Sequence, residues 1–371
     1  MQSNNEKSFL AMVRAGLWEK EVHLKPFGEI DFEKVQHLAE EQSAVGLVAA
    51  GLEHVVDVKV PQKDVLRIIG QTLKLEQQNQ AMNHFIGVLV EKMRKAGINA
   101  VLVKGQGIAQ CYERPLWRAC GDVDFFLDDE NYKKAKEYLI PLASHVEVEG
   151  IASMHLGMTI GPWVVELHGT MLAGLSSRID KVLNIIKDDV FKRNDVRLWM
   201  NDATQVFLPG VNSDVLLVFT HFLKHFYKGG LGIRQICDWC RLLWTYRSTI
   251  DRDRLVGELR KMCLVSEWQA FAAFAVDYLG MPAEAMPLYS TDRKWKRKAG
   301  RICAFVLEVG NFGHSRDNSY YNKYPYLIRK TISFGRRFGD LCRHASIFPL
   351  DSIRFLPKIM FNGLRSAIRG E

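Results

Sequence analysis

The chain has 371 residues, of which 47% are hydrophobic and 25% charged, a composition that is ordinary for a folded protein and excludes a largely disordered one. Its length allows about two or three domains with a substantial core. Lys and Arg number 50 against 42 for Asp and Glu, and this positive excess favours an acidic partner: nucleotide, nucleic acid or an anionic surface.

Targeting signals are not apparent in the sequence. No run reaches the ~18 apolar residues of a membrane-spanning helix, and the amino terminus does not have the basic and apolar regions of a signal peptide. Seven cysteines, an odd number scattered along the chain, favour reduced thiols over a disulfide framework. We therefore expect a cytoplasmic protein without a transmembrane segment.

Residues 1–96 are predicted to form a helical N-terminal subdomain. Apolar residues recur at three- and four-residue spacing over Phe32–Leu52 and over Val65–Ala96, which is the pattern of helices that bury one face. Gly97 is well placed to end the second helix.

Residues 97–208 are predicted to form an α+β unit, a small mixed sheet with helices on one face. The aliphatic run from Ile98 to Val103 ends at the sequence KGQG (104–107), a pattern that indicates a buried strand turning into a helix. Backbone N–H groups at such a turn can face an anion. Asp128 and the two acidic residues after it are predicted to cap a helix over 131–142, and further strands are predicted over 144–150, 152–160, 163–168 and 197–208.

Three carboxylates stand out in this unit. Asp122 and Asp124 lie two residues apart in a strand-like run, so they project from the same face, while Val123 and Phe125 face the core. Adjacent carboxylates repel each other, which calls for a cation between them, and Mg²⁺ is the simplest candidate. Glu166 lies in a later strand-like run and is a candidate third ligand. The alternative is a solvated, structural Asp pair.

These motifs, in this order, resemble the nucleotidyltransferase superfamily with the DNA polymerase beta-like fold. More closely, the segments LVKGQGIAQCYERPLWRACGDVDFFL, VVELH and HFLKHFYKGGLGIRQICDW look like a bacterial group known as uncharacterised nucleotidyltransferases, with a resemblance that covers about residues 85–243. The resemblance implies an enzyme that moves a nucleoside monophosphate from an NTP to an acceptor, which is a small molecule, a tRNA or a protein. It also implies two-metal-ion catalysis with Mg²⁺, or alternatively Mn²⁺, held by the catalytic residues Asp122, Asp124 and Glu166.

The turn after the first strand departs from the superfamily pattern. The superfamily usually carries Gly-Ser there, where the serine helps to hold the triphosphate, whereas this chain has Lys104-Gly105-Gln106. A lysine replaces a hydroxyl hydrogen bond with a charge that pairs with phosphate. The alternative function is therefore a catalytically degenerate fold that binds nucleotide or a partner without chemistry. The residues predicted to bind nucleotide are Lys104, Gly105, Gln106, Arg118, Gly121, Lys224 and Arg234.

Residues 209–310 are predicted to form a helical subdomain that closes the cleft. One helix begins near Ser213 and ends at the glycine pair 229–230, and the next runs over Ile233–Tyr246. Lys224 and Arg234 are predicted to reach phosphates across the cleft. The residues expected to shape the site are His168, His221, His225 and Asp238.

Two other interpretations of this corner stay open. Arg234 and Asp238, four residues apart on a helix, fit a structural ion pair. Alternatively, four residues have zinc-ligand chemistry at local spacings: His221, His225, Cys237 and Cys240. The thiols lie in an apolar stripe, where buried cysteines are unremarkable, so zinc is the weaker hypothesis.

The chain closes with helices to about Leu279, a break over 281–287 and a helix over 294–309. Residues 311–371 form a basic, amphipathic segment, and its stretch 323–371 is rich in Lys and Arg and poor in acids. This composition suits binding to nucleic acid or to an anionic membrane surface. The preferred interpretation is an amphipathic tail packed on the body, with its basic groups in solvent.

Overall fold

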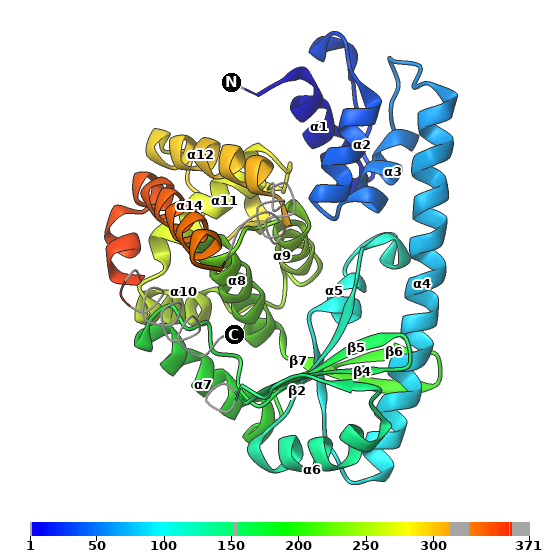
Figure 1. The fold of residues 1–371 in the computed structure, drawn as a ribbon. Coiled ribbons are helices and arrows are strands. Elements are labelled where there is room, and N and C mark those ends of the chain that lie inside the picture. Colours follow the sequence, from blue (N-terminus) through cyan, green and yellow to red (C-terminus); the bar gives the residue numbers. More distant parts are fainter. Residues whose placement is uncertain (1, 151–153, 312–325, 356, 358–371) are drawn as a thin grey trace.

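A computed structural model of the chain, which describes residues 2–150, 154–311, 326–355 and 357, shows a small mixed sheet flanked by helices (Figure 1). The predicted α+β class is confirmed. Within the described residues no helix is long and apolar enough to cross a bilayer.

The N-terminal part is helical, as predicted, but the segment 32–52 forms two helices with a break between them instead of a continuous helix. The helices are α1 (Asn4–Trp18), α2 (Phe32–Glu41), α3 (Val45–Glu53) and α4 (Gln62–Lys95), with a short 3₁₀ turn at Lys25–Phe27. The chain breaks after α2, where Ser43 has a left-handed φ of 52°. The buried Gln42 side chain there hydrogen-bonds the backbone of Ile233 and of Val306, both at 2.9 Å. This long-range contact has no signature in the local periodicity.

The main sheet has the strand order β1-β2-β5-β4-β3. Its strands are β1 (Val101–Val103), β2 (Asp122–Phe126), β3 (His145–Val146), β4 (His155–Ile160) and β5 (Trp163–His168). Strand β2 runs parallel to β5, and the other neighbours are antiparallel. The strand predicted over 144–150 is shorter than expected, and the one predicted from residue 152 begins outside the described residues.

Helices cover both faces of the sheet near β2, whereas one face was predicted. Val123 and Phe125 are buried in a cluster with residues of α4 and of α6 (Asp129–Leu139). Phe126, on the opposite face, contacts Phe191 of α7 (Ser177–Lys192) with ring centroids 5.0 Å apart. Helix α7 has no counterpart among the predicted elements. The predicted cap of α6 is confirmed, because Asp128 accepts a hydrogen bond from the Asn131 N–H at 2.7 Å.

The segment 197–208, predicted as a strand, forms a hairpin of β6 (Val196–Asn201) and β7 (Thr204–Pro209), which is a separate two-stranded sheet. The reason is a turn at Asp202, whose φ is 50°. A sharp reversal there lets the two halves pair with each other instead of extending the main sheet.

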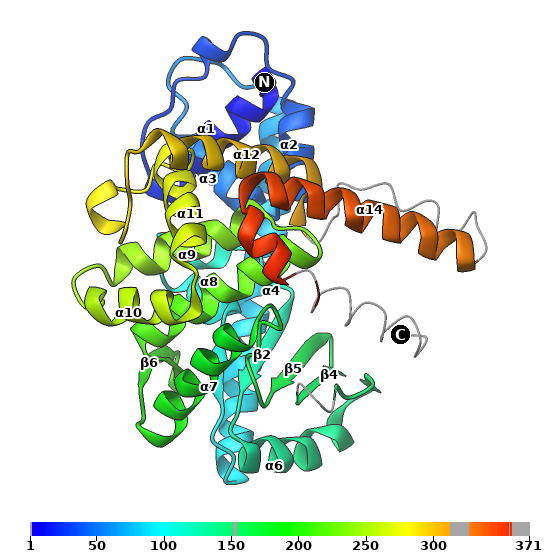
Figure 2. The same ribbon diagram turned by 90° about the vertical axis from the view of Figure 1, so that its left-hand side faces the viewer.

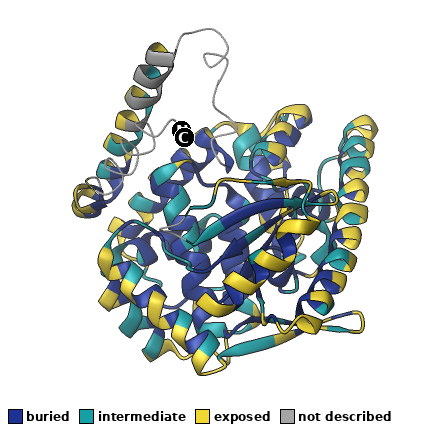
Figure 3. Ribbon diagram, turned by 60° about the horizontal axis from the view of Figure 1, so that its bottom comes forward, coloured by how far each residue is buried: buried dark blue, intermediate teal, exposed yellow. Residues whose placement is uncertain are grey.

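The remaining described chain is helical and packs beside the sheet (Figures 1 and 2). Its helices are α8 (Val211–Lys228), α9 (Ile233–Thr245), α10 (Arg252–Met262), α11 (Val265–Asp277), α12 (Arg293–Val309) and α14 (Tyr326–Ile347), together with short helix α5 (Gly105–Ala109) earlier in the chain. An aromatic core holds the bundle together: the rings of Phe219, Trp239 and Trp268 lie 4.7 to 5.6 Å apart. In Figure 3 the buried segments, in dark blue, lie towards the middle of the molecule, and exposed residues, in yellow, lie mostly on the outer helices.

Helix α14 projects from the body in Figure 2 and is anchored at its C-terminal end. There His344 and Phe348 are buried against Phe226, whereas Phe338 is 61% exposed. The tail therefore packs on the body at the C-terminal end of α14. Part of the basic stretch 323–371 lies outside the described residues, including Lys323, Lys358, Arg365 and Arg369.

Candidate functional site

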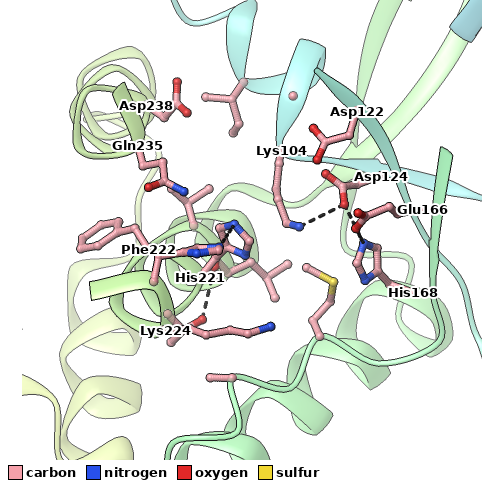
Figure 4. Close-up of a pocket in the computed structure, with 18 of the residues that line it drawn as sticks. Lys104, Asp122, Asp124, Glu166, His168, His221, Phe222, Lys224, Gln235 and Asp238 are labelled. Atoms are coloured by element: carbon pink, nitrogen blue, oxygen red, sulfur yellow. Dashed lines mark hydrogen bonds and ion pairs between the residues drawn. The ribbon is translucent and has the colours of Figure 1, made fainter. Parts of the chain in front are cut away.

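A cavity of about 410 Å³ lies between the main sheet and helices α8 and α9. Figure 4 shows carboxylates on its sheet side and the side chains of α8 and α9 opposite them. Most of the residues singled out in the sequence line it: Lys104, Gly105, Arg118, Asp122, Asp124, Glu166, His168, His221, Lys224, His225, Arg234 and Asp238. The volume falls in the range of about 300 to 1,000 Å³ typical of small-molecule sites.

The parallel pairing of β2 with β5 brings the three carboxylates together. Asp124 is the register partner of Glu166, and Asp122 lies two residues away on the same face. One carboxylate oxygen from each of Asp122, Asp124 and Glu166 falls within 4.8 Å of the others. Three oxygen donors at this separation match the hard ligands that Mg²⁺ prefers.

Lys104 lies at the end of β1 and directs its amine to these carboxylates. Its Nζ is 3.1 Å from Asp124 Oδ1. Burial would lower the pKa of Lys104, but the charges of Asp124, Glu166 and Asp122 outweigh that effect and raise it. Lys104 has a φ of 57°, a left-handed backbone conformation that costs free energy in a non-glycine residue and that is common at functional sites. The turn thus holds a positive charge over Asp124.

His168 lies on the other side of Asp124. Its Nε2 is 2.6 Å from Asp124 Oδ1 and 3.3 Å from Glu166 Oε2. Burial and Lys104 would lower the pKa of His168, but the hydrogen bonds to both carboxylates raise it overall. Burial would likewise raise the pKa of Asp124, yet Lys104 and His168 lower it. Lys104 and His168 thus both favour the ionised form of Asp124.

Asp122 differs from Asp124 in that no described side chain donates a hydrogen bond to its carboxylate, whereas Lys104 and His168 both contact that of Asp124. The pKa of Asp122 is raised, first by the loss of water in the cavity and then by repulsion from Asp124. Asp122 is thus the one carboxylate of the three that forms no ion pair with a described residue. A divalent ion bound there would supply the missing positive charge.

His155 is a residue of the site that sequence reasoning missed. Its Nε2 lies 3.1 Å from Glu166 Oε2. The segment that carries it was predicted as a strand, but only the antiparallel register of β4 and β5 places His155 opposite His168. The signal that could have found it is the two-residue turn Gly161-Pro162 between β4 and β5, because a hairpin loop of that length fixes the register of the two strands.

The opposite wall of the cavity is basic and comes from α8. Burial, followed by the charge of Lys104, lowers the pKa of Lys224. His221 and His225 lie on successive turns, with their Nε2 atoms 3.1 Å apart. Burial lowers the pKa of His221 well below its usual range and that of His225 to about 3, so both are neutral at physiological pH. The zinc hypothesis has no support in this geometry, since none of the ligand clusters within the described residues includes either histidine.

Arg118 and Asp238 form a buried ion pair at the base of the cavity. Arg118 donates to both carboxylate oxygens of Asp238, at 3.0 and 2.7 Å, and the Tyr112 hydroxyl donates to the same carboxylate at 2.8 Å. Arg234 instead donates to the Ala119 carbonyl at 3.0 Å. The alternative pairing considered above, Arg234 with Asp238, is therefore wrong, because the segment before β2 packs directly on α9 and Arg118 takes the Asp238 carboxylate.

Replacing Asp238 by Ala is expected to destabilise the protein by about 3–5 kcal/mol, because it leaves the buried Arg118 charge without its partner. Urea unfolding measures this loss. The control is Asp253→Ala, an exposed helical aspartate of α10, for which we expect a change within about 0.5 kcal/mol. Equal effects of the two substitutions would contradict the assigned pairing.

Two residues of the predicted nucleotide site do not line the cavity. The Gln106 side chain is buried, with its amide donating to Asn79 Oδ1 of α4 at 2.7 Å. Gly121 is exposed just before β2. The Gln106 side chain is thus used in packing the turn on α4.

The site thus combines three convergent carboxylates on the sheet with basic side chains of α8 and α9 across the cavity. A sequence model of the family described as "uncharacterised nucleotidyltransferase" matches residues 28–280, and the chain belongs to this family. Comparisons with curated proteins and with solved structures gave no match.

Proposed function

We propose that this protein transfers a nucleoside monophosphate from an NTP to an acceptor, using a core of the DNA polymerase beta-like type over residues 97–208. The observation that carries the proposal is the register of β2 and β5, which sets Glu166 level with Asp124 and completes a three-carboxylate group. The family membership supports the same reaction. The helices over 1–96 and 209–310 are then the flanking subdomains.

The residues present fit a divalent ion. Asp122, Asp124 and Glu166 would hold it, because one oxygen of each carboxylate lies within 4.8 Å of the others. When bound there in a pair, Mg²⁺ ions supply the charge that activates an acceptor hydroxyl and stabilises the leaving pyrophosphate. The protein's own contribution is to fix the three oxygens on two neighbouring strands.

The basic groups of the cavity are placed to bind the triphosphate. Lys104, Lys224 and Arg234 line the same space as the carboxylates. We infer that Lys104 and Lys224 pair with phosphate oxygens, since each is an ammonium group aimed into the cavity (Figure 4). Arg118 acts differently: its pairing with Asp238 makes it a positioning residue for α9.

One observation favours the second candidate, a nucleotide-binding protein without chemistry. Lys104 and His168 both contact Asp124 Oδ1, so this carboxylate is already neutralised without a metal. In that case nucleotide binding would not need Mg²⁺.

The test incubates purified, untagged protein with each α-³²P-labelled NTP, Mg²⁺ and cell extract separated into small-molecule, RNA and protein fractions. We expect pyrophosphate release and labelling of one fraction, both of which disappear with EDTA. Nucleotide binding that is unchanged by EDTA, with no labelled product from any fraction, would favour the second candidate. Release of inorganic phosphate instead of pyrophosphate would contradict nucleotidyl transfer.

A further inference from the structure

A second convergent group lies beside the three carboxylates and contains two imidazoles. His155, Glu166 and His168 each offer one ligand atom, and these atoms lie within 4.8 Å of one another. The Nε2 atoms of both histidines lie close to the same oxygen, Glu166 Oε2, at 3.1 and 3.3 Å. Two imidazole nitrogens beside one carboxylate oxygen form a ligand set unlike the all-oxygen group next to it.

The fold holds this group in place without help from loops. His155 of β4 is the antiparallel register partner of His168 of β5, so the two side chains are direct cross-strand neighbours. Glu166 lies two residues before His168 on the same strand and therefore projects from the same face. All three ligands sit on adjacent, hydrogen-bonded strands, which limits how far they can move apart.

The separations suit neighbouring ligands of a single ion. Bonds of about 2.0–2.1 Å to nitrogen and about 2.0–2.2 Å to carboxylate oxygen place adjacent ligands roughly 3.3–3.5 Å apart at a tetrahedral angle and roughly 2.9–3.0 Å apart at a right angle. The observed 3.1 and 3.3 Å lie within these limits. Asp124 Oδ1, 2.6 Å from His168 Nε2, provides a fourth ligand after a small outward shift.

We propose that His155, Glu166 and His168 form a cation site that prefers a first-row transition-metal ion of the zinc and cobalt type over Mg²⁺. Imidazole nitrogen suits Zn²⁺ and its neighbours in the series, whereas Mg²⁺ favours carboxylate and water oxygens. The His155 side chain is 35% exposed, so an ion can enter from the solvent. The proposal concerns ion binding alone and does not depend on nucleotidyl transfer.

His155 is the residue that distinguishes the imidazole group from the all-oxygen group. Glu166 belongs to both the all-oxygen group and the imidazole group, whereas His155 belongs only to the second. Replacing His155 by Gln should therefore weaken binding of a transition-metal ion and leave Mg²⁺ binding unchanged. A matched control is His145→Gln, because His145 lies in the same sheet, on β3, with an exposed side chain.

The experiment titrates Co²⁺ and, separately, Mg²⁺ into metal-free wild-type protein and both variants by calorimetry. We expect wild-type protein to bind Co²⁺ at least about 100-fold more tightly than Mg²⁺. His155→Gln should lower the Co²⁺ affinity by about 10- to 100-fold with less than a threefold change for Mg²⁺, and His145→Gln should change neither. Unchanged Co²⁺ affinity in His155→Gln, or an equal loss for both ions, would overturn the proposal.

A measurement on the wild-type protein covers the case in which His155→Gln fails to fold. X-ray absorption at the cobalt edge detects imidazole by its characteristic outer-shell scattering. Two imidazoles per bound Co²⁺ are expected. A shell of oxygen ligands only would refute the site even if the ion binds tightly.

Discussion

Asp122→Asn is expected to lower nucleotidyl transfer by about 10³-fold without lowering the stability of the metal-free protein. A metal-bound transition state gains several kcal/mol from its ion, and each 1.4 kcal/mol corresponds to a tenfold change in rate. The pKa of Asp122 is raised in the folded protein, by loss of water and by Asp124. Its charge therefore opposes folding above its unfolded pKa, near pH 4, and removing that charge relieves repulsion at pH 7.

Asp124→Asn is the informative comparison. The pKa of Asp124 is lowered by Lys104 and His168 despite its burial, so its charge favours folding at neutral pH and that contribution is lost as the pH falls through the folded pKa. The Asn variant should lose both transfer and stability. The assay is label transfer in the responsive extract fraction, with thermal unfolding in EDTA and Asp253→Asn as control. Full transfer by either cluster variant would refute the carboxylate mechanism.

Lys104→Ala is expected to reduce the rate of transfer by about 10²–10³-fold, the usual effect of removing one preorganised group that stabilises developing charge. Nucleotide affinity should fall as well, because the amine is placed to pair with phosphate. The same substitution removes the cation 3.1 Å from Asp124 Oδ1, so Mg²⁺ should bind more tightly in the absence of nucleotide. A merely structural lysine would not produce these opposite shifts.

Two further substitutions distinguish the effect of losing the Lys104 amine from the effect of backbone strain at that residue. Lys104→Gly removes the amine and also relieves the left-handed conformation at φ 57°, so it should be as inactive as Lys104→Ala but more stable. Lys133→Ala, on the exposed side of α6, is the control for loss of a lysine. Activity that returns in the Gly variant would show that strain, and not charge, limits Lys104→Ala.

Local sequence determined the parts of this protein that depend on near neighbours along the chain. Alternation in the run at 122–126 placed Asp122 and Asp124 on one face and buried Val123 and Phe125. Asp128 capped its helix, and the glycine pair at 229–230 separated α8 from α9. Each of these follows from periodicity or from a single capping contact, which a linear pattern records directly.

Only the tertiary structure decided which elements meet. The parallel register of β2 and β5, which lie far apart in the sequence, sets Glu166 beside Asp124. No turn joins these two strands, so their register depends on how they pack in the fold, whereas the tight Gly161-Pro162 turn makes the β4–β5 register that adds His155 a local feature. For the same reason Arg118 pairs with Asp238, 120 residues away, instead of with an aspartate four residues along. The pKa values of the side chains that line the cavity depend on those distant contacts, because burial and neighbouring charge act through space and not along the chain.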